Sequence, residues 1–135
     1  MADTFTFELV SPEKLLLSGD AEIVTVPAAE GDMGVLSNHA PVMTSLRPGL
    51  VSVKMSDGAD SEYFVKGGFA DITPEAVTVL AEFAVPRSEL TSEMMAEQRK
   101  AAEEAMNAEK DENRKADHQS YLDQLTHFEE TMMAM

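Results

Sequence analysis

Glycine and proline occur only in the first two-thirds of the sequence, and this distribution constrains the fold more than any other feature. All 7 glycines and all 6 prolines lie at or before Pro86. From Arg87 onward the sequence is dominated by Ala, Glu, Met, Lys and Gln, which are good helix formers. Because glycine and proline mark turns, we expect a turn-rich domain over residues 1–86 and a helical segment over residues 87–135. A chain of 135 residues is long enough for one compact domain with such an appendage.

The first part carries the alternating pattern of short β-strands. In TFTFELV, Phe5, Phe7 and Leu9 fall on one face and polar residues fall on the other, which is the period of a half-buried strand. Turn signals such as SGD, RPG, SDG and TPE separate similar runs, namely AEIVTV, LVSVKM, EYFVK, FADIT and AVTVL. Many short strands without helices between them predict an antiparallel sandwich or barrel and disfavour an α/β fold.

The tail is predicted to form an antiparallel hairpin of two helices. Pro86 precedes the first helix, for which Ser88 or Thr91 would be the N-cap. The charged stretch from Lys110 to Asp117 is the expected connector.

Each predicted helix has an apolar stripe that must pack against something. In the second helix the stripe consists of Tyr121, Leu125, Phe128, Met132 and Met135. In the first helix the larger stripe consists of Leu90, Met94, Ala101, Ala105 and Ala108, and the smaller one of Met95, Ala102 and Met106. Small side chains allow close approach, so the larger stripe is expected to face the second helix. The smaller stripe remains for the sandwich or for another protein.

The charge balance narrows the classes of partner. The chain has 10 basic and 25 acidic residues, a formal net charge of −15. Nucleic acids and anionic membrane surfaces are bound through basic clusters, so neither is an expected partner. With no cysteine, disulfides, zinc–thiolate sites and thiol nucleophiles are excluded. The sequence shows no leader and no run long enough to span a bilayer, so we expect a soluble chain that is not exported.

One stretch, EGDMGVLSNHAP from Glu30 to Pro41, holds two acids and a histidine. Glu30, Asp32 and His39 are candidates for a divalent metal or acid–base site of an enzyme, since carboxylates and imidazole are common ligands. The alternative is a loop shaped by its glycines, with His39 hydrogen-bonded to the backbone. The sequence has no serine-hydrolase elbow and no phosphate-binding loop, so we expect a non-catalytic protein without a cofactor.

The ordered fragments VSPEKLLLSG, EGDMGVLSNHAP, TSLRPG, FVKGGFADI and VTVLAE, followed by a helical tail, resemble the epsilon subunit family of bacterial F-type ATP synthases, the counterpart of the mitochondrial delta subunit. The resemblance covers residues 4–85 and extends to the tail in length and character only. It implies a flattened ten-stranded β-sandwich followed by a two-helix antiparallel hairpin. It also implies a rotor role, in which the sandwich joins the gamma subunit to the c-ring and couples proton flow to ATP synthesis.

The resemblance further implies which residues meet these partners. Glu30, Asp32, Met33 and His39 match the part of the family that meets the polar loops of the c-ring. Ser11 and Thr44 match the side that faces gamma. The expected location is the cytoplasmic side of a bacterial inner membrane, as a peripheral part of the complex.

The tail departs from the family in two respects. In many members the hairpin extends along gamma and inhibits ATP hydrolysis through basic residues of the second helix, with contacts to the alpha and beta subunits. Here residues 120–135 contain no Lys or Arg, so inhibition is expected to be weakened, although a mobile hairpin acting mainly as an inhibitor remains the alternative. Some members bind ATP through an I-D-x-x-R-A motif, of which the stretch Leu90–Met95 keeps neither the acid nor the arginine, so no nucleotide site is expected.

Overall fold

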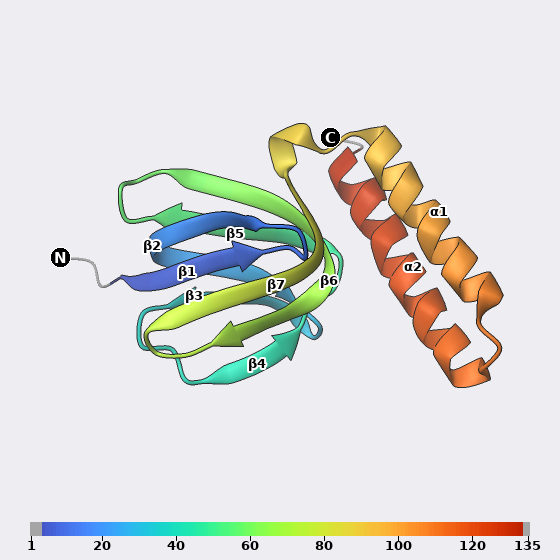
Figure 1. Cartoon of the computed structure of the whole chain (residues 1–135), viewed down its shortest axis with the longest axis horizontal. Helices are drawn as coiled ribbons and strands as arrows, with labels where there is room; N and C mark the ends of the chain where they lie inside the picture. The colour runs from blue at the N-terminus through green and yellow to red at the C-terminus, as the bar shows by residue number, and fades with distance from the viewer. Residues whose placement is uncertain (1–3, 134–135) are drawn as a thin grey trace. The chain divides into compact units, whose positions relative to one another are not determined.

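A computed structural model describes residues 4–133 of the chain (Figure 1). These residues form two compact units that divide between Ser88 and Glu89, two residues beyond the boundary expected from the sequence. The first unit is built of strands and the second of helices. No helix in the described part of the chain has the length and apolar character needed to cross a bilayer.

The first unit contains seven strands. They are β1 (Phe5–Val10), β2 (Leu15–Ala28), β3 (Gly31–Leu36), β4 (Val42–Ser45), β5 (Gly49–Met55), β6 (Asp60–Ile72) and β7 (Ala76–Pro86). The strands follow the order β1-β7-β6-β5-β2-β3, and β1 also pairs with β2, so the sheet closes on itself. β4 pairs with β6 outside this order. β1 and β7 run parallel, and the other pairings within residues 4–133 are antiparallel.

The three long strands each serve both layers of the sandwich. β2 pairs with β1 over residues 15–21 and with β5 and β3 over residues 21–28. β6 pairs with β5 over residues 60–65 and with β4 over residues 69–72, while only the first half of β7 pairs with β1. When the two halves of these three strands are counted separately, the seven strands become the ten that the resemblance implied. Figure 1 shows the long strands curving around a common interior.

Glycines at the midpoint of β6 permit this change of layer. Gly67 and Gly68 have φ values of 68° and 106°, which are positive values that residues with a Cβ atom disfavour. A Cβ on Gly68 would lie 2.0 Å from the carbonyl oxygen of Leu80 on the paired strand. The two strands therefore approach closely where β6 bends, and EYFVK and FADIT are two halves of one strand rather than two strands.

The core lies between the two layers. Alternate residues of β1 are buried in it, as the sequence pattern predicted. Phe5, Phe7 and Leu9 are at most 4% exposed, whereas Thr4 and Thr6 are exposed. Full burial of one such side chain stabilises the fold by about 1.5–3 kcal/mol. The other inward-facing residues continue this core through the remaining strands, among them Val24, Val26, Val35, Val51, Val65, Ile72, Val77 and Val79.

The stretch from Glu30 to Pro41, for which the sequence left open a metal or acid–base site or a loop, is partly a strand. Residues 31–36 of this stretch form β3, which pairs with β2 as a hairpin. Its glycines concealed the alternation, because Gly31 and Gly34 carry no side chain by which to judge a face. The neighbouring β4 was also not foreseen, since its four residues are too few for a recognisable period.

A 3₁₀ turn (Arg87–Glu89) spans the division between the units, and the second unit contains α1 (Ser92–Ala108) and α2 (Glu112–Met133). Thr91 is the N-cap, since its side chain accepts a hydrogen bond of 3.1 Å from the N–H of Met94. The helices are joined by residues 109–111, so the connector is shorter than the predicted stretch from Lys110 to Asp117. Asp111 begins α2 by accepting from the N–H groups of Asn113 and Arg114.

The faces of α1 are used in the opposite way to the prediction. Ala101, Ala105 and Ala108 are exposed, whereas Met95 and Ala102 of the smaller stripe are buried. Arg99 lies on the same face as this smaller stripe and pairs with Glu129 of α2, so this face is turned toward α2. Methionine supplies more apolar area for this contact than alanine does. In α2 the buried residues are Leu122, Leu125 and Phe128; Met135 and the side chain of Met132 lie outside the described part of the chain.

Candidate functional site

The acids and the histidine of the Glu30–Pro41 stretch do not form a cluster. Glu30 lies in the β2–β3 turn, and His39 follows the far end of β3. The six residues of β3 separate them by about 20 Å at the rise of an extended strand. The His39 imidazole hydrogen-bonds through Nδ1 to the Ala40 carbonyl at 2.8 Å, which was the backbone role considered as an alternative. Within residues 4–133 no three or more His, Asp or Glu side chains lie close enough together to hold a metal ion, and Glu30, Asp32 and His39 are not brought together.

The two ends of β3 are held by different parts of the sandwich. On one side the Ala29 N–H donates to the Ser45 carbonyl at 2.9 Å, which fixes the β2–β3 turn against β4. On the other side the Asn38 N–H donates to the Pro74 carbonyl at 3.0 Å, in the turn between β6 and β7. Asn38 has a φ of 65°, a left-handed conformation that asparagine tolerates better than most residues. Glu30 and His39 are thus presented separately, each from a fixed turn.

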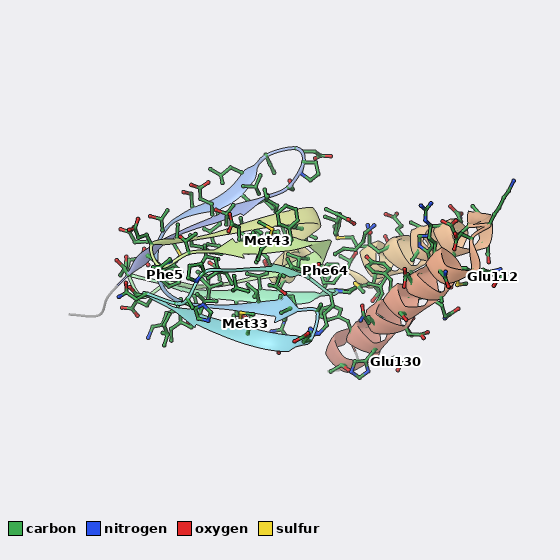
Figure 2. The ribbon with its side chains drawn as sticks, turned by 90° about the horizontal axis from the view of Figure 1, so that it is seen from below. Phe5, Met33, Met43, Phe64, Glu112 and Glu130 are labelled. Atoms are coloured by element: carbon green, nitrogen blue, oxygen red, sulfur yellow. The ribbon has the colours of Figure 1, made fainter. Side chains whose placement is uncertain are left out.

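Asp32 and Met33 point to opposite sides of β3. Asp32 faces outward and forms an ion pair of 2.5 Å with Arg47, which lies between β4 and β5. Met33 is opposite Val26 in the ladder and packs against the core, partly buried. Figure 2 marks Met33 among the side chains of the sandwich. Met33 therefore contributes to packing, and its exposed part alone is open to a partner.

Ser11 and Thr44 differ in the surface that they offer. Ser11 caps the β1–β2 turn, where its N–H donates to the Lys14 carbonyl at 2.9 Å. Thr44 is opposite the buried Ala70, so its half-buried side chain points inward relative to Met43 and Ser45. Of the two, only Ser11 lies beside the exposed side chains of Phe69 and Leu80.

Large apolar side chains gather on the outer face of β1, β7, β6 and β4. In the ladders Val10 is opposite Leu80, Leu80 is opposite Phe69, and Phe69 is opposite Ser45. Met43, two residues before Ser45, shares this face and is 64% exposed; Phe69 and Leu80 are 39% and 37% exposed. We call Val10, Met43, Phe69 and Leu80 the β4–β7 apolar surface. Figure 2 labels Met43 on its strand.

An open hollow lies beside Val10, Phe69 and Leu80 of this surface. It is lined by Val10, Ser11, Pro12, Ser45, Gly68, Phe69, Leu80, Ala81 and Glu82. Gly68 is one of these lining residues, and a Cβ there would collide with the backbone of β7. The hollow is open and mostly apolar, which suits a protein side chain better than a charged small molecule.

Sequence reasoning missed this surface, although a signal was present. Phe69 alternates with the buried Ala70 and shares its face with Asp71, and Leu80 shares its face with Thr78. A large apolar residue on an otherwise polar strand face indicates a contact surface. The same signal occurs on the other layer at Ile23 and Leu36, which are opposite each other and 42% and 59% exposed.

Residues 4–87 match the family described as the ATP synthase, Delta/Epsilon chain, beta-sandwich domain. Curated relatives extend the likeness over the tail. The ATP synthase epsilon chain of Parvibaculum lavamentivorans is 42% identical over 130 residues, 96% of each chain. That of Paramagnetospirillum magneticum is 48% identical over 116 residues, 86% of this chain and 87% of the other.

The chain belongs to the ATP synthase delta/epsilon family. As an epsilon chain it is a subunit of the synthase complex. Solved structures agree with this assignment. A chain in the structure of the Euglena gracilis mitochondrial ATP synthase with its c-ring has a TM-score of 0.70 and 25% identity, covering 96% of this chain and 81% of that chain. A chain in the central stalk and c-ring of Tetrahymena thermophila mitochondrial ATP synthase has a TM-score of 0.63 at 13% identity, which is a likeness of fold; the match covers 93% of this chain and 96% of that chain.

Proposed function

We propose that this epsilon chain is a non-catalytic rotor subunit of the central stalk, where it joins the gamma subunit to the c-ring and couples proton flow to ATP synthesis. The observation that carries this proposal is an uncovered apolar surface on a closed, densely packed sandwich. A part that transmits torque must resist deformation, and packed protein interiors have low compressibility. Cross-strand pairing in a closed order adds to this stiffness, because the sheet has few free edges.

The β4–β7 apolar surface is proposed as the face toward gamma. Ser11, which the family resemblance assigned to gamma, lines the hollow of this surface together with Phe69 and Leu80. Thr44 contributes through its outward neighbours Met43 and Ser45, since its own side chain faces inward. An apolar face of this kind gains stability when a partner removes it from water.

The c-ring contact is proposed at the two ends of β3. Glu30 and Asp32 lie at the exposed β2–β3 turn, and His39 lies beyond the other end of the strand. An acidic turn against a basic loop of the ring would fix their mutual orientation through complementary charge. The chain is then a peripheral component on the cytoplasmic side of a bacterial inner membrane.

The proposed gamma face is tested by one charge substitution and a matched control. Phe69→Glu places a carboxylate in the hollow, and Ile23→Glu places one on the other layer at nearly equal exposure, 39% against 42%. In binding measurements with isolated gamma subunit, Phe69→Glu is expected to weaken affinity at least tenfold, because a buried unpaired charge is costly. Ile23→Glu is expected to leave affinity unchanged. Equal effects of the two substitutions would refute the assignment of the face.

The helical unit is proposed to play a lesser regulatory role. Its buried residues pack α1 against α2, and Arg99 pairs with Glu129 across the hairpin. The outer side of α2 carries Asp123 and Glu130, both exposed, and would repel an acidic segment of a catalytic subunit. Synthase rebuilt with residues 1–88 is therefore expected to hydrolyse ATP at the rate of synthase rebuilt with the full chain. Faster hydrolysis with the shorter chain would instead support the alternative, a mobile hairpin acting mainly as an inhibitor.

A further inference from the structure

The end of β4 and the segment between β4 and β5 are attached to the β2–β3 hairpin through their main chain. The Ala29 N–H donates to the Ser45 carbonyl at 2.9 Å. The Arg47 N–H donates to the Pro27 carbonyl, also at 2.9 Å. Both bonds lie beside the turn that carries Glu30, so this segment supports the turn from one side.

The side chain of Arg47 extends the same attachment to the second strand of the hairpin. Its Nη2 lies 2.5 Å from Oδ1 of Asp32, and Asp32 is the residue opposite Pro27 in the ladder. Arg47 thus contacts β2 with its backbone and β3 with its guanidinium. Gly49 leaves room for this arrangement, because a Cβ there would lie 2.8 Å from Pro27 Cβ and 3.5 Å from Nη1 of Arg47.

The ion pair also changes which charge the turn presents. The Arg47 side chain is 28% exposed and the Asp32 side chain 67% exposed, so the carboxylate is accessible but already has a cationic partner. Glu30 is exposed, and none of the ion pairs found within residues 4–133 involves it. A fixed ion pair contributes little net charge at a distance, whereas a lone carboxylate attracts cations over about one Debye length, roughly 8 Å at physiological salt.

We propose that Arg47 is a positioning residue for the β2–β3 turn. It holds Asp32 and neutralises it, and it thereby leaves Glu30 as the carboxylate that meets a basic side chain in the polar loop of a c subunit. This inference rests on the proposed c-ring contact and assigns different roles to the two acids of the turn.

The positioning role is tested first on the full chain alone, by the hydrogen exchange of the Ala29 amide. Arg47→Met and Asp32→Asn are each expected to speed exchange about two- to fivefold, the equivalent of losing an exposed ion pair. Arg47→Lys is expected to restore slow exchange in part. The control Arg87→Met removes the other exposed arginine pair of the sandwich, with Glu62 at 3.0 Å, and is expected to leave Ala29 unchanged. Unchanged exchange in Arg47→Met and Asp32→Asn would overturn the positioning role.

The charge assignment is tested by binding of the full chain to synthase depleted of this subunit, measured at several salt concentrations. Glu30→Gln is expected to weaken binding and to flatten its salt dependence, because one attractive charge is lost. The double variant Asp32→Asn with Arg47→Met keeps the net charge, so it is expected to weaken binding while keeping the salt dependence of the unaltered chain. If this double variant flattened the salt dependence as much as Glu30→Gln does, the neutralisation of Asp32 by Arg47 would be overturned.

Failure of the inference and failure of the proposed function give different results in these experiments. If Glu30→Gln left binding unchanged while the depleted synthase still required the chain for proton pumping, the role of Glu30 would be overturned and the rotor function would stand. If the depleted synthase pumped protons equally well without the chain, the rotor function itself would fail. The exchange of Ala29 does not depend on either result.

Discussion

Replacement of Gly68 by alanine tests whether the bend of β6 depends on a residue without a side chain. Gly68 has a φ of 106°, and an alanine Cβ there would lie 2.0 Å from the Leu80 carbonyl oxygen and 2.9 Å from Ala81 Cα. The backbone conformation alone costs a non-glycine residue about 1–3 kcal/mol. The colliding atoms belong to the backbone of β7, so no rotation of a side chain relieves the clash. We therefore expect Gly68→Ala to lower the free energy of unfolding by about 3 kcal/mol or more.

Gly34→Ala is the matched control within the same sandwich. Gly34 lies in β3, its φ is not positive, and a Cβ there would meet nothing within 4 Å. Alanine at such a position is expected to stabilise by up to about 1 kcal/mol, because it reduces the freedom of the unfolded chain. The two glycine substitutions thus have opposite expected signs, although each adds a single methyl group.

Urea unfolding measures this difference. The chain has two tyrosines and no tryptophan, so a Tyr121→Phe background leaves Tyr63 as the fluorescent reporter of the sandwich. With a slope of about 1 kcal/mol per molar urea for a domain of this size, Gly68→Ala is expected to move the unfolding midpoint down by about 3 M. If the urea midpoint of Gly68→Ala agreed within about 0.5 M with that of the chain that keeps Gly68, the close approach of β6 and β7 would be refuted.

Two further predictions concern the helical unit. Arg99→Met removes the ion pair with Glu129 and is expected to speed amide hydrogen exchange in the last turns of α2 by up to about fivefold. The control Lys100→Met, at the neighbouring exposed position, is expected to leave this exchange unchanged. Equal effects of the two substitutions would contradict a stabilising role of the ion pair. The N–H of Asp111 donates to the Glu109 carboxylate at 3.1 Å and holds the pKa of Glu109 below its usual value. The stabilisation of the turn is therefore complete at a pH above the ordinary carboxyl pKa and is lost as the pH falls through the lowered pKa of Glu109. A titration of the Glu109 carboxyl by NMR with an unshifted midpoint would refute this prediction.

Local sequence patterns were sufficient to predict the class of fold. The alternation of Phe5, Phe7 and Leu9 predicted their burial, because a strand turns successive side chains to opposite faces whatever its partners are. The absence of glycine and proline after Pro86 likewise predicted helices, since helix propensity is a property of short segments. These predictions needed no knowledge of contacts distant in the sequence.

The candidate site was predicted only as a stretch of sequence. Glu30, Asp32, Met33 and His39 are near one another along the chain, but β3 points Met33 inward and separates Glu30 from His39. The partner of Asp32 is Arg47, fifteen residues away, and no spacing rule relates the two. The same limit applies to the apolar stripes of α1, where the alanines of the larger stripe proved to be exposed and Met95 and Ala102 of the smaller stripe proved to be buried.

The sequence by itself determined that the first part of the chain is built of strands and the second of helices, and which residues of β1 are buried. Each of these follows from local periodicity and backbone preference. Only the tertiary structure decided that Val10, Met43, Phe69 and Leu80 share one outward surface, and that Arg47 reaches Asp32. Those juxtapositions depend on the pairing of strands far apart in the chain and on a bend at Gly68 that lets one strand serve both layers.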